Sequence, residues 1–173
     1  MFFKKALIFV LVAIFIFFGT VAGAGTVAGV ENTRVVLLYY FNYRMLLQEF
    51  PFEPEKAVFP VYRQIPESTT LIRDTIELLI MIRDTIELLI RGELTEEEEE
   101  LGFITEFPHP GFRLVDLDLT EDGTLILEFT EIFGFTTGGS ARILVMREQI
   151  EKTACQFAAV KRVEYFPESL FQP

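Results

Sequence analysis

The sequence predicts an α+β domain, a two-layer sandwich in which helices cover one face of a mostly antiparallel sheet. Two observations predict it. Stretches rich in β-branched and aromatic residues, or with period-two alternation, occur in several parts of the chain, and stretches with helical apolar spacing lie between them. Turn signals separate these stretches and give the order β-β-α-β-β-α-β. With 173 residues, 50% of them hydrophobic and 24% charged, the chain is long enough for one core and too apolar to be disordered.

Residues 1–24 predict a signal peptide or a membrane anchor. Lys4 and Lys5 precede an uncharged stretch that runs from residue 6 to residue 30, and the Ala-Gly-Ala sequence at 22–24 offers the small residues that a signal peptidase requires. The same uncharged stretch is also long enough to span a hydrocarbon core of about 30 Å as an uncleaved anchor. In both cases we expect an exported protein of the cell envelope, anchored or secreted, on the extracytoplasmic side of the cytoplasmic membrane.

The charge of the exported part excludes some partners. Without Lys4 and Lys5 it has 13 basic and 26 acidic residues, a formal charge of −13. Nucleic acid requires a basic surface, and anionic lipid headgroups repel an acidic one, so we expect membrane contact only through the N-terminal segment. The single cysteine, Cys155, cannot form an internal disulfide, and its apolar neighbours predict a buried, inert thiol.

Two strands and two helices are predicted in the first half of the domain, after a linker at residues 25–33. Residues 34–41 are β-branched and aromatic, as in a central strand, and residues 58–65 form a second strand, which Pro60 places at an edge or gives a late start. A long helix then begins near residues 68–70, which supply N-cap oxygens, and ends at a glycine, Gly92. A shorter helix begins at Thr95, with Glu98 completing a capping box.

The second half predicts a hairpin, a helix and a last strand. Alternation begins after Phe112, and Glu121-Asp122-Gly123 turns the chain back into a strand at 124–130. Ser140 is predicted to cap a helix that continues to Phe157, with an apolar stripe of Ile143, Met146, Ile150 and Phe157. Residues 160–166 form the last strand. The domain therefore spans residues 34–166, and residues 167–173 form a C-terminal tail.

The long helix contains a duplicated decapeptide. Residues 71–80 and 81–90 are identical at nine of ten positions. Ten residues add roughly 15 Å of helix and about 1000° of rotation, around 80° short of three turns, so the apolar stripe of the second copy is turned away from that of the first. A helix of about 33 Å overhangs a strand of roughly 23 Å. Either the chain's own loops absorb this overhang, or it is a hydrophobic projection used for self-association.

The candidate interaction surface combines the second copy with the aromatic side chains of a proline-containing loop. Its residues are Ile82, Ile86, Leu89, Phe50 and Phe52.

The inventory of reactive side chains predicts no catalytic residue, no metal and no cofactor. His109 is the only imidazole and lies in a Pro-His-Pro-Gly turn, and Ser140 lacks the surroundings of a nucleophile elbow. One cysteine and one histidine are too few for zinc. Asp116, Asp118 and Asp122 do not have the spacing of a calcium loop, and the five glutamates at 96–100 indicate a solvated helix start.

Several segments together resemble one known family, the GerMN domain of sporulation and spore-germination proteins. They are Arg63-Gln-Ile-Pro66, the helix end Leu88 to Gly92, the stretch from Glu93 to Pro108, the hairpin Leu114 to Phe129, and Gln149 to Phe157 continuing into Val160 to Phe166. The resemblance covers residues 34–166. The chain departs from the family pattern in the extra decapeptide, in the exit Phe166-Pro167 and in lacking an N-terminal lipid-bearing cysteine.

The resemblance implies an extracytoplasmic, non-catalytic module, similar in fold to ring-building domains, that associates with membrane-anchored partners during sporulation. We therefore expect an interaction or assembly module that docks to an envelope or membrane-associated protein or forms a homo-oligomer. The alternative is a cell-envelope hydrolase that uses acidic residues.

Overall fold

A computed structural model describes residues 33–47, 53–66 and 74–172 of the chain. The predicted signal or anchor at 1–24 and the predicted caps at 68–70 lie outside these residues. The elements run in the order β1 (Thr33–Asn42), α1 (Tyr43–Leu46), the 3-10 turn η1 (Pro54–Ala57), β2 (Val58–Pro66), α2 (Asp74–Arg91), α3 (Glu96–Glu100), β3 (Phe103–Ile104), β4 (Leu114–Leu119), β5 (Thr124–Phe129), α4 (Ser140–Ala154) and β6 (Arg162–Phe166). This order confirms the mixed α+β class, with α1, η1 and β3 as additions.

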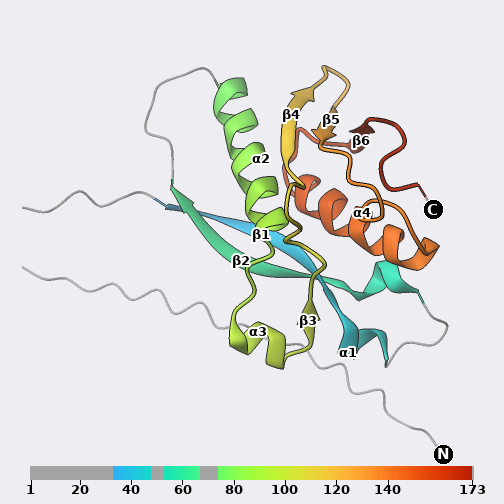
Figure 1. The fold of residues 1–173 in the computed structure, drawn as a ribbon. Helices are drawn as coiled ribbons and strands as arrows, with labels where there is room; N and C mark the ends of the chain where they lie inside the picture. The colour runs from blue at the N-terminus through green and yellow to red at the C-terminus, as the bar shows by residue number, and fades with distance from the viewer. Residues whose placement is uncertain (1–32, 48–52, 67–73, 173) are drawn as a thin grey trace, which may run out of the picture. The chain divides into compact units, whose positions relative to one another are not determined.

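The strands form two sheets, whereas a single sheet was predicted. One sheet has the order β2-β1-β3, with both pairings antiparallel, and the other has the order β4-β5-β6, with β5 and β6 parallel. Strand β2 lies at an edge, as Pro60 indicated. Helices α2 and α4 contact strands of both sheets, so they do not cover one face of a continuous sheet (Figure 1).

Side chains of α4 and of the turn after it occupy the second edge of β1. The Leu37 N–H donates to Gln156 Oε1 at 2.8 Å, and Gln156 Nε2 donates to the Leu37 carbonyl at 2.7 Å. The Tyr39 N–H donates to Thr153 Oγ1 at 3.0 Å. A carboxamide and a hydroxyl thus take the hydrogen bonds that a further strand would make. This explains why the second sheet does not continue the first.

The second copy of the decapeptide lies in the core, which corrects the prediction that it forms a contact surface. Ile82, Ile86 and Leu89 are all 0% exposed. In the first copy, by contrast, Ile76 is 46% exposed and Ile80 is 42% exposed. The two copies do present different faces, as the helical rotation predicts, but it is the first copy that is left facing solvent.

Gly92 explains why the first copy is the exposed one. Its φ of +64° ends α2 in the left-handed region that favours glycine, and a Cβ there would overlap the backbone carbonyl of Phe107. The C-terminal end of α2 is therefore held against the core. Ten additional residues extend the helix at its other end.

Aromatic side chains fill the core beside the second sheet, and the C-terminal tail contributes to them. Phe112 stacks on Phe129 with centroids 4.9 Å apart, and Phe171 meets Tyr165 edge-on at 5.0 Å. Leu170 and Phe171 are 3% and 1% exposed, so the described part of the predicted tail, residues 167–172, is not an appendage to the domain. Its apolar residues complete the core.

Helix α4 departs from its prediction at both ends. Gly139 is the N-cap and Ser140 is the first helical residue, with no side-chain capping bond from Gly139, and the helix ends at Ala154 and not at Phe157. Cys155, at the C-cap, is exposed and not buried. Ile143, Met146 and Ile150 are buried as the stripe predicted. Of the helices in the described ranges, none combines the length and apolarity that a membrane span needs.

Candidate functional site

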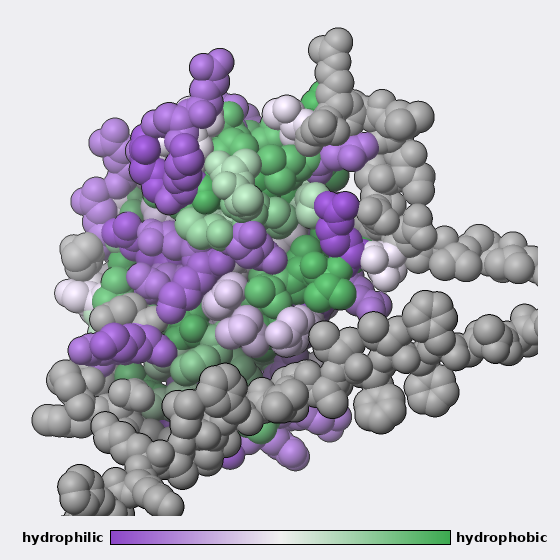
Figure 2. Space-filling view, turned by 180° about the vertical axis from the view of Figure 1, so that it is seen from behind, coloured by the Kyte–Doolittle hydropathy of each residue, from purple (hydrophilic) through white to green (hydrophobic). Residues whose placement is uncertain are grey.

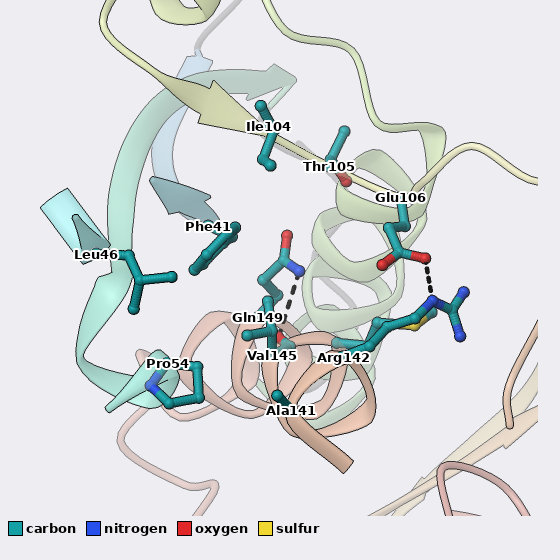
Figure 3. A pocket seen from close by; sticks show the side chains of 11 residues that line it. Phe41, Leu46, Pro54, Ile104, Thr105, Glu106, Ala141, Arg142, Val145 and Gln149 are labelled. Atoms are coloured by element: carbon teal, nitrogen blue, oxygen red, sulfur yellow. Dashed lines mark hydrogen bonds and ion pairs between the residues drawn. The ribbon is translucent and has the colours of Figure 1, made fainter. Parts of the chain in front are cut away.

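An apolar hollow of about 310 Å³ opens on one face of α4, and we name it the α4 groove (Figure 3). Its walls come from the end of β1, from α1 and η1, from β3 with the segment after it, and from α4. The lining residues are Phe41, Leu46, Pro54, Ile104, Thr105, Glu106, Ala141, Arg142, Val145, Met146 and Gln149.

The spacing of residues on α4 creates the groove. Ala141, Val145 and Gln149 follow one another at intervals of four, so they lie along one face of the helix. The neighbouring core stripe, which includes Met146, is turned toward the interior. Across the groove, Phe41 and Ile104 are partners in the β1–β3 ladder, so their side chains lie on the same side of the sheet.

Gln149 is the polar group inside this groove. The residue is 1% exposed, and its Nε2 donates to the Val145 carbonyl at 3.3 Å. Its Oε1 is buried and has no hydrogen-bond partner among the described residues. Figure 3 shows this oxygen pointing into the groove, toward Ile104 and Thr105. A buried acceptor without a partner is destabilising, so a donor that reached Oε1 would remove that cost.

An ion pair between Arg142 and Glu106 forms the rim of the groove (Figure 3). Arg142 Nη1 also donates to the carbonyls of Phe135 at 2.7 Å and Thr137 at 3.1 Å. Through these hydrogen bonds the guanidinium stabilises the loop before α4. The Glu106 side chain, which is 45% exposed, is the one carboxylate of the lining.

The predicted interaction residues do not line the α4 groove. Ile82, Ile86 and Leu89 pack in the core, and Phe50 and Phe52 lie outside the described residues. The sequence did not predict the groove because the lining residues come from five separate elements. The usable signal was Gln149, a polar residue that directly precedes a core position of the α4 stripe.

The other candidate residues have structural roles. His109 closes a turn, because the Phe112 N–H donates to its carbonyl at 3.0 Å, and its ring stacks on Phe135 at 4.2 Å. The imidazole lines a shallow hollow that also includes Glu87 and Glu93. In the part of the chain that the structure describes, no three or more His, Cys, Asp or Glu side chains are grouped so as to hold a metal ion. The alternative of a hydrolase stays a prediction.

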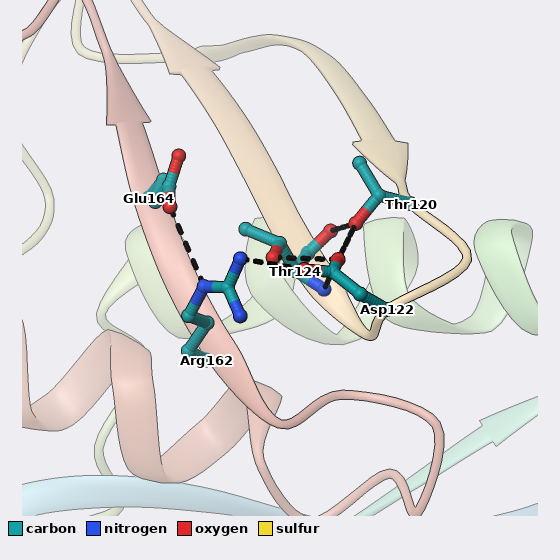
Figure 4. Close-up of polar contacts among 5 residues, drawn as sticks. All are labelled: Thr120, Asp122, Thr124, Arg162 and Glu164. Carbon is teal, nitrogen blue, oxygen red and sulfur yellow. Dashed lines mark hydrogen bonds and ion pairs between the residues drawn. The ribbon is translucent and has the colours of Figure 1, made fainter.

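Asp122 fixes the turn of the β4–β5 hairpin to β6 (Figure 4). Its carboxylate accepts hydrogen bonds from the hydroxyls of Thr120 and Thr124 and from Arg162 Nη2 at 2.7 Å. Arg162 also contacts Glu164 of the same strand. The bonds from Thr120, Arg162 and Thr124 hold the pKa of Asp122 well below its ordinary value of 3.8. This carboxylate is therefore part of the turn.

Further apolar surface lies where α2 and the turn after α4 meet β1. A hollow there is lined by Val35, Leu78, Met81 and Phe157, among others. On the outer face of the first sheet, Val35 is 57% exposed and Tyr62 is 62% exposed. Figure 2, which views the molecule from behind, shows apolar areas interrupting the hydrophilic surface. Uncovered apolar surface is thus present outside the α4 groove as well.

Comparison with known proteins gives a family match and solved structures that are similar to the chain. A sequence model of the Germane family, described as "Sporulation and spore germination", matches residues 38–164. No curated protein matches the chain.

Two of the similar solved structures come from the sporulation protein GerM of Bacillus subtilis. The structure of its tandem GerMN domains is 21% identical over 81% of this chain and 42% of that chain, with a TM-score of 0.47. The structure of its first GerMN domain is 16% identical over 76% of this chain and 80% of that one, with a TM-score of 0.44. The present chain therefore spans less than half of the tandem structure.

Proposed function

Because the chain belongs to the Germane family of sporulation and spore germination domains, we propose that it is a non-catalytic, extracytoplasmic assembly module that docks to a membrane-associated protein. The observation that supports docking is the α4 groove. It presents apolar walls at the surface together with one buried acceptor, Gln149 Oε1, that lacks a partner among the described residues.

The composition of the groove favours a protein partner. A small apolar hollow with a single polar group that fixes orientation is the usual form of a pocket that receives an anchoring side chain at an interface. The formal charge of −11 for the whole chain argues against nucleic acid and against anionic lipid surfaces as the occupant. The partner in this proposal is therefore a protein of the cell envelope, reached by a domain that is exported.

Site-specific photocrosslinking in cells tests this proposal. A compact diazirine amino acid, close to leucine in size, at Val145 inside the groove leaves the groove open and is expected to yield a discrete adduct with one envelope protein. The same amino acid at Asp118, an exposed position on β4, serves as the matched control and is expected not to yield that adduct. A charged substitution in the groove, Ala141→Arg, is expected to abolish the adduct. Identical crosslinking at both positions would contradict docking through the α4 groove.

Self-association through the first copy of the decapeptide is a second candidate, supported by the exposure of Ile76 and Ile80 on α2. We expect the protein to form a concentration-dependent dimer that Ile80→Glu disrupts. Light scattering after size-exclusion chromatography measures this. A monomer at high concentration, unchanged by the substitution, would contradict self-association and leave docking through the groove in place.

A further inference from the structure

We propose that the α4 groove recognises an aromatic side chain that carries an N–H or O–H donor, the side chain of a tryptophan or tyrosine in the partner protein, and that this donor bonds to Gln149 Oε1. This inference rests on the proposed docking function and names the chemistry of the docked residue.

The orientation of the Gln149 carboxamide determines which kind of group can enter. Its Nε2 donates to the Val145 carbonyl, so Oε1 must face the groove. Rotating the carboxamide by 180° would place Oε1 against that carbonyl oxygen and would oppose two acceptors. The groove therefore presents an acceptor, and the complementary ligand group is a donor.

The other polar side chains of the lining are engaged elsewhere. Thr105 Oγ1 accepts from the Phe107 N–H at 3.1 Å, and Arg142 bonds to Glu106 and to two backbone carbonyls. Among the described residues no donor reaches Gln149 Oε1. The groove is thus an apolar pocket with one buried polar atom that lacks a partner among the described residues, and with the Arg142–Glu106 ion pair at its rim.

The size and walls of the groove select an aromatic side chain. A volume of about 310 Å³ lies at the lower end of the range of about 300–1,000 Å³ for ligand pockets, so it suits one large side chain. An aliphatic side chain would fill it and leave Oε1 without a donor, and a lysine or arginine would lose its hydration among apolar walls. Tryptophan and tyrosine combine an apolar ring with a donor at one edge, and Phe41 offers a ring to pack against.

The composition of the chain helps to distinguish the source of that side chain. The sequence contains no tryptophan, so an indole in the groove has to belong to another protein. A tyrosine could come from another protein or from a second copy of this chain. The identity of the protein in the Val145 adduct separates these two sources.

The test compares probes that differ only in the donor. The full chain, reconstituted in lipid nanodiscs, is titrated with indole and 1-methylindole, and with p-cresol and 4-methylanisole, and binding is followed by ligand-observed saturation-transfer NMR. Each donor-bearing probe is expected to bind roughly fivefold more tightly than its methylated analogue, the effect of one hydrogen bond. Gln149→Met is expected to remove this preference, whereas Gln64→Met, which changes an exposed glutamine on β2, is expected to keep it.

Two further measurements distinguish loss of the hydrogen bond from loss of the fold in the Gln149→Met variant. The midpoint of thermal unfolding is expected to rise in Gln149→Met, because the substitution removes a buried acceptor without a partner. Val145→Phe, which fills the groove and leaves Gln149 in place, is expected to abolish binding of all four probes. Equal binding of each pair to the wild-type protein, or a preference that persists in Gln149→Met, would overturn the inference.

The outcomes of the two proposals are distinguishable. If the Val145 adduct forms but the paired probes bind equally, docking stands and aromatic donor recognition fails. If the probes show the preference but no adduct forms, the pocket chemistry stands and docking to an envelope protein fails. Loss of the adduct when a partner tryptophan is changed to phenylalanine supports the indole as the natural occupant. Persistence of the adduct after such a change at every tryptophan and tyrosine of the partner's crosslinked segment would overturn the inference.

Discussion

The two copies of the decapeptide allow the contribution of tertiary packing to be measured against an almost identical local sequence. Ile76 and Ile86 occupy equivalent positions in the copies, yet Ile76 is 46% exposed and Ile86 is 0% exposed. Removing the buried methyl and methylene groups of Ile86 leaves a cavity, so Ile86→Ala is expected to lower the free energy of unfolding by about 3 kcal/mol. Ile76→Ala removes half-exposed groups and improves helix propensity, so its effect is expected to stay within about 0.5 kcal/mol.

Urea unfolding followed by circular dichroism measures both variants. With a denaturant dependence of about 2 kcal/mol/M, the midpoint of Ile86→Ala is expected about 1.5 M below that of the wild-type protein, and the midpoint of Ile76→Ala within about 0.3 M of it. Equal losses at the two positions would refute the reasoning, because they would place the first copy in the core as well. A negligible loss at Ile86 would show that the second copy is not packed as the structure describes.

Three further predictions concern interactions elsewhere in the fold. Burial raises the pKa of Glu98, but hydrogen bonds from Arg63 and from the Thr95 backbone outweigh this effect and hold the pKa below its ordinary value of 4.5. At a pH just below 4.5 the carboxylate is therefore still charged in the folded protein and already protonated in the unfolded chain. The free energy of unfolding is therefore expected to fall as the pH drops below about 4.5 and through the lower pKa of the folded state. Urea titrations at pH 7, 4 and 3 measure this, and the Glu98→Gln variant is expected to show a smaller dependence of the free energy of unfolding on pH. Gly92→Ala is expected to lower the free energy of unfolding by about 3 kcal/mol or more, because the left-handed φ and the overlap with the Phe107 carbonyl both oppose a Cβ. A loss below about 1 kcal/mol in thermal unfolding would contradict this. Gln156→Ala is expected to destabilise the protein by about 1–2 kcal/mol and to accelerate hydrogen exchange of the β1 amide that its side chain now covers, and unchanged exchange would exclude this role.

Much of the local structure was predictable because it depends on near neighbours in the chain. The β-branched run gave β1, observed at Thr33–Asn42, and the alternation gave the β4–β5 hairpin. The capping box between Thr95 and Glu98 is confirmed, with both of its hydrogen bonds present. Gly92 ends α2 as predicted. Each of these features follows from backbone preferences or from hydrogen bonds over a few residues.

The α4 groove was not predictable in the same way. Its walls join Phe41, Leu46, Pro54 and Ile104 to residues of α4, and no local pattern connects these positions. Whether Gln149 Oε1 has a hydrogen-bond partner depends on the residues around it in the folded protein, so the sequence cannot show that it lacks one. The division into two sheets likewise depends on Gln156, whose side chain reaches a strand more than one hundred residues earlier.

The amino-acid sequence by itself determined the class of the domain, the order and approximate ends of its main elements, and its membership in a sporulation and spore germination family, because periodicity, caps and motif order are local properties. The tertiary structure alone decided which copy of the duplicated decapeptide is buried. Rotation along the helix shows that the copies face different ways, but only the anchoring of the C-terminal end of α2 at Gly92 selects the one that meets the core. Burial depends on what lies opposite a residue, and two nearly identical local sequences cannot encode that difference.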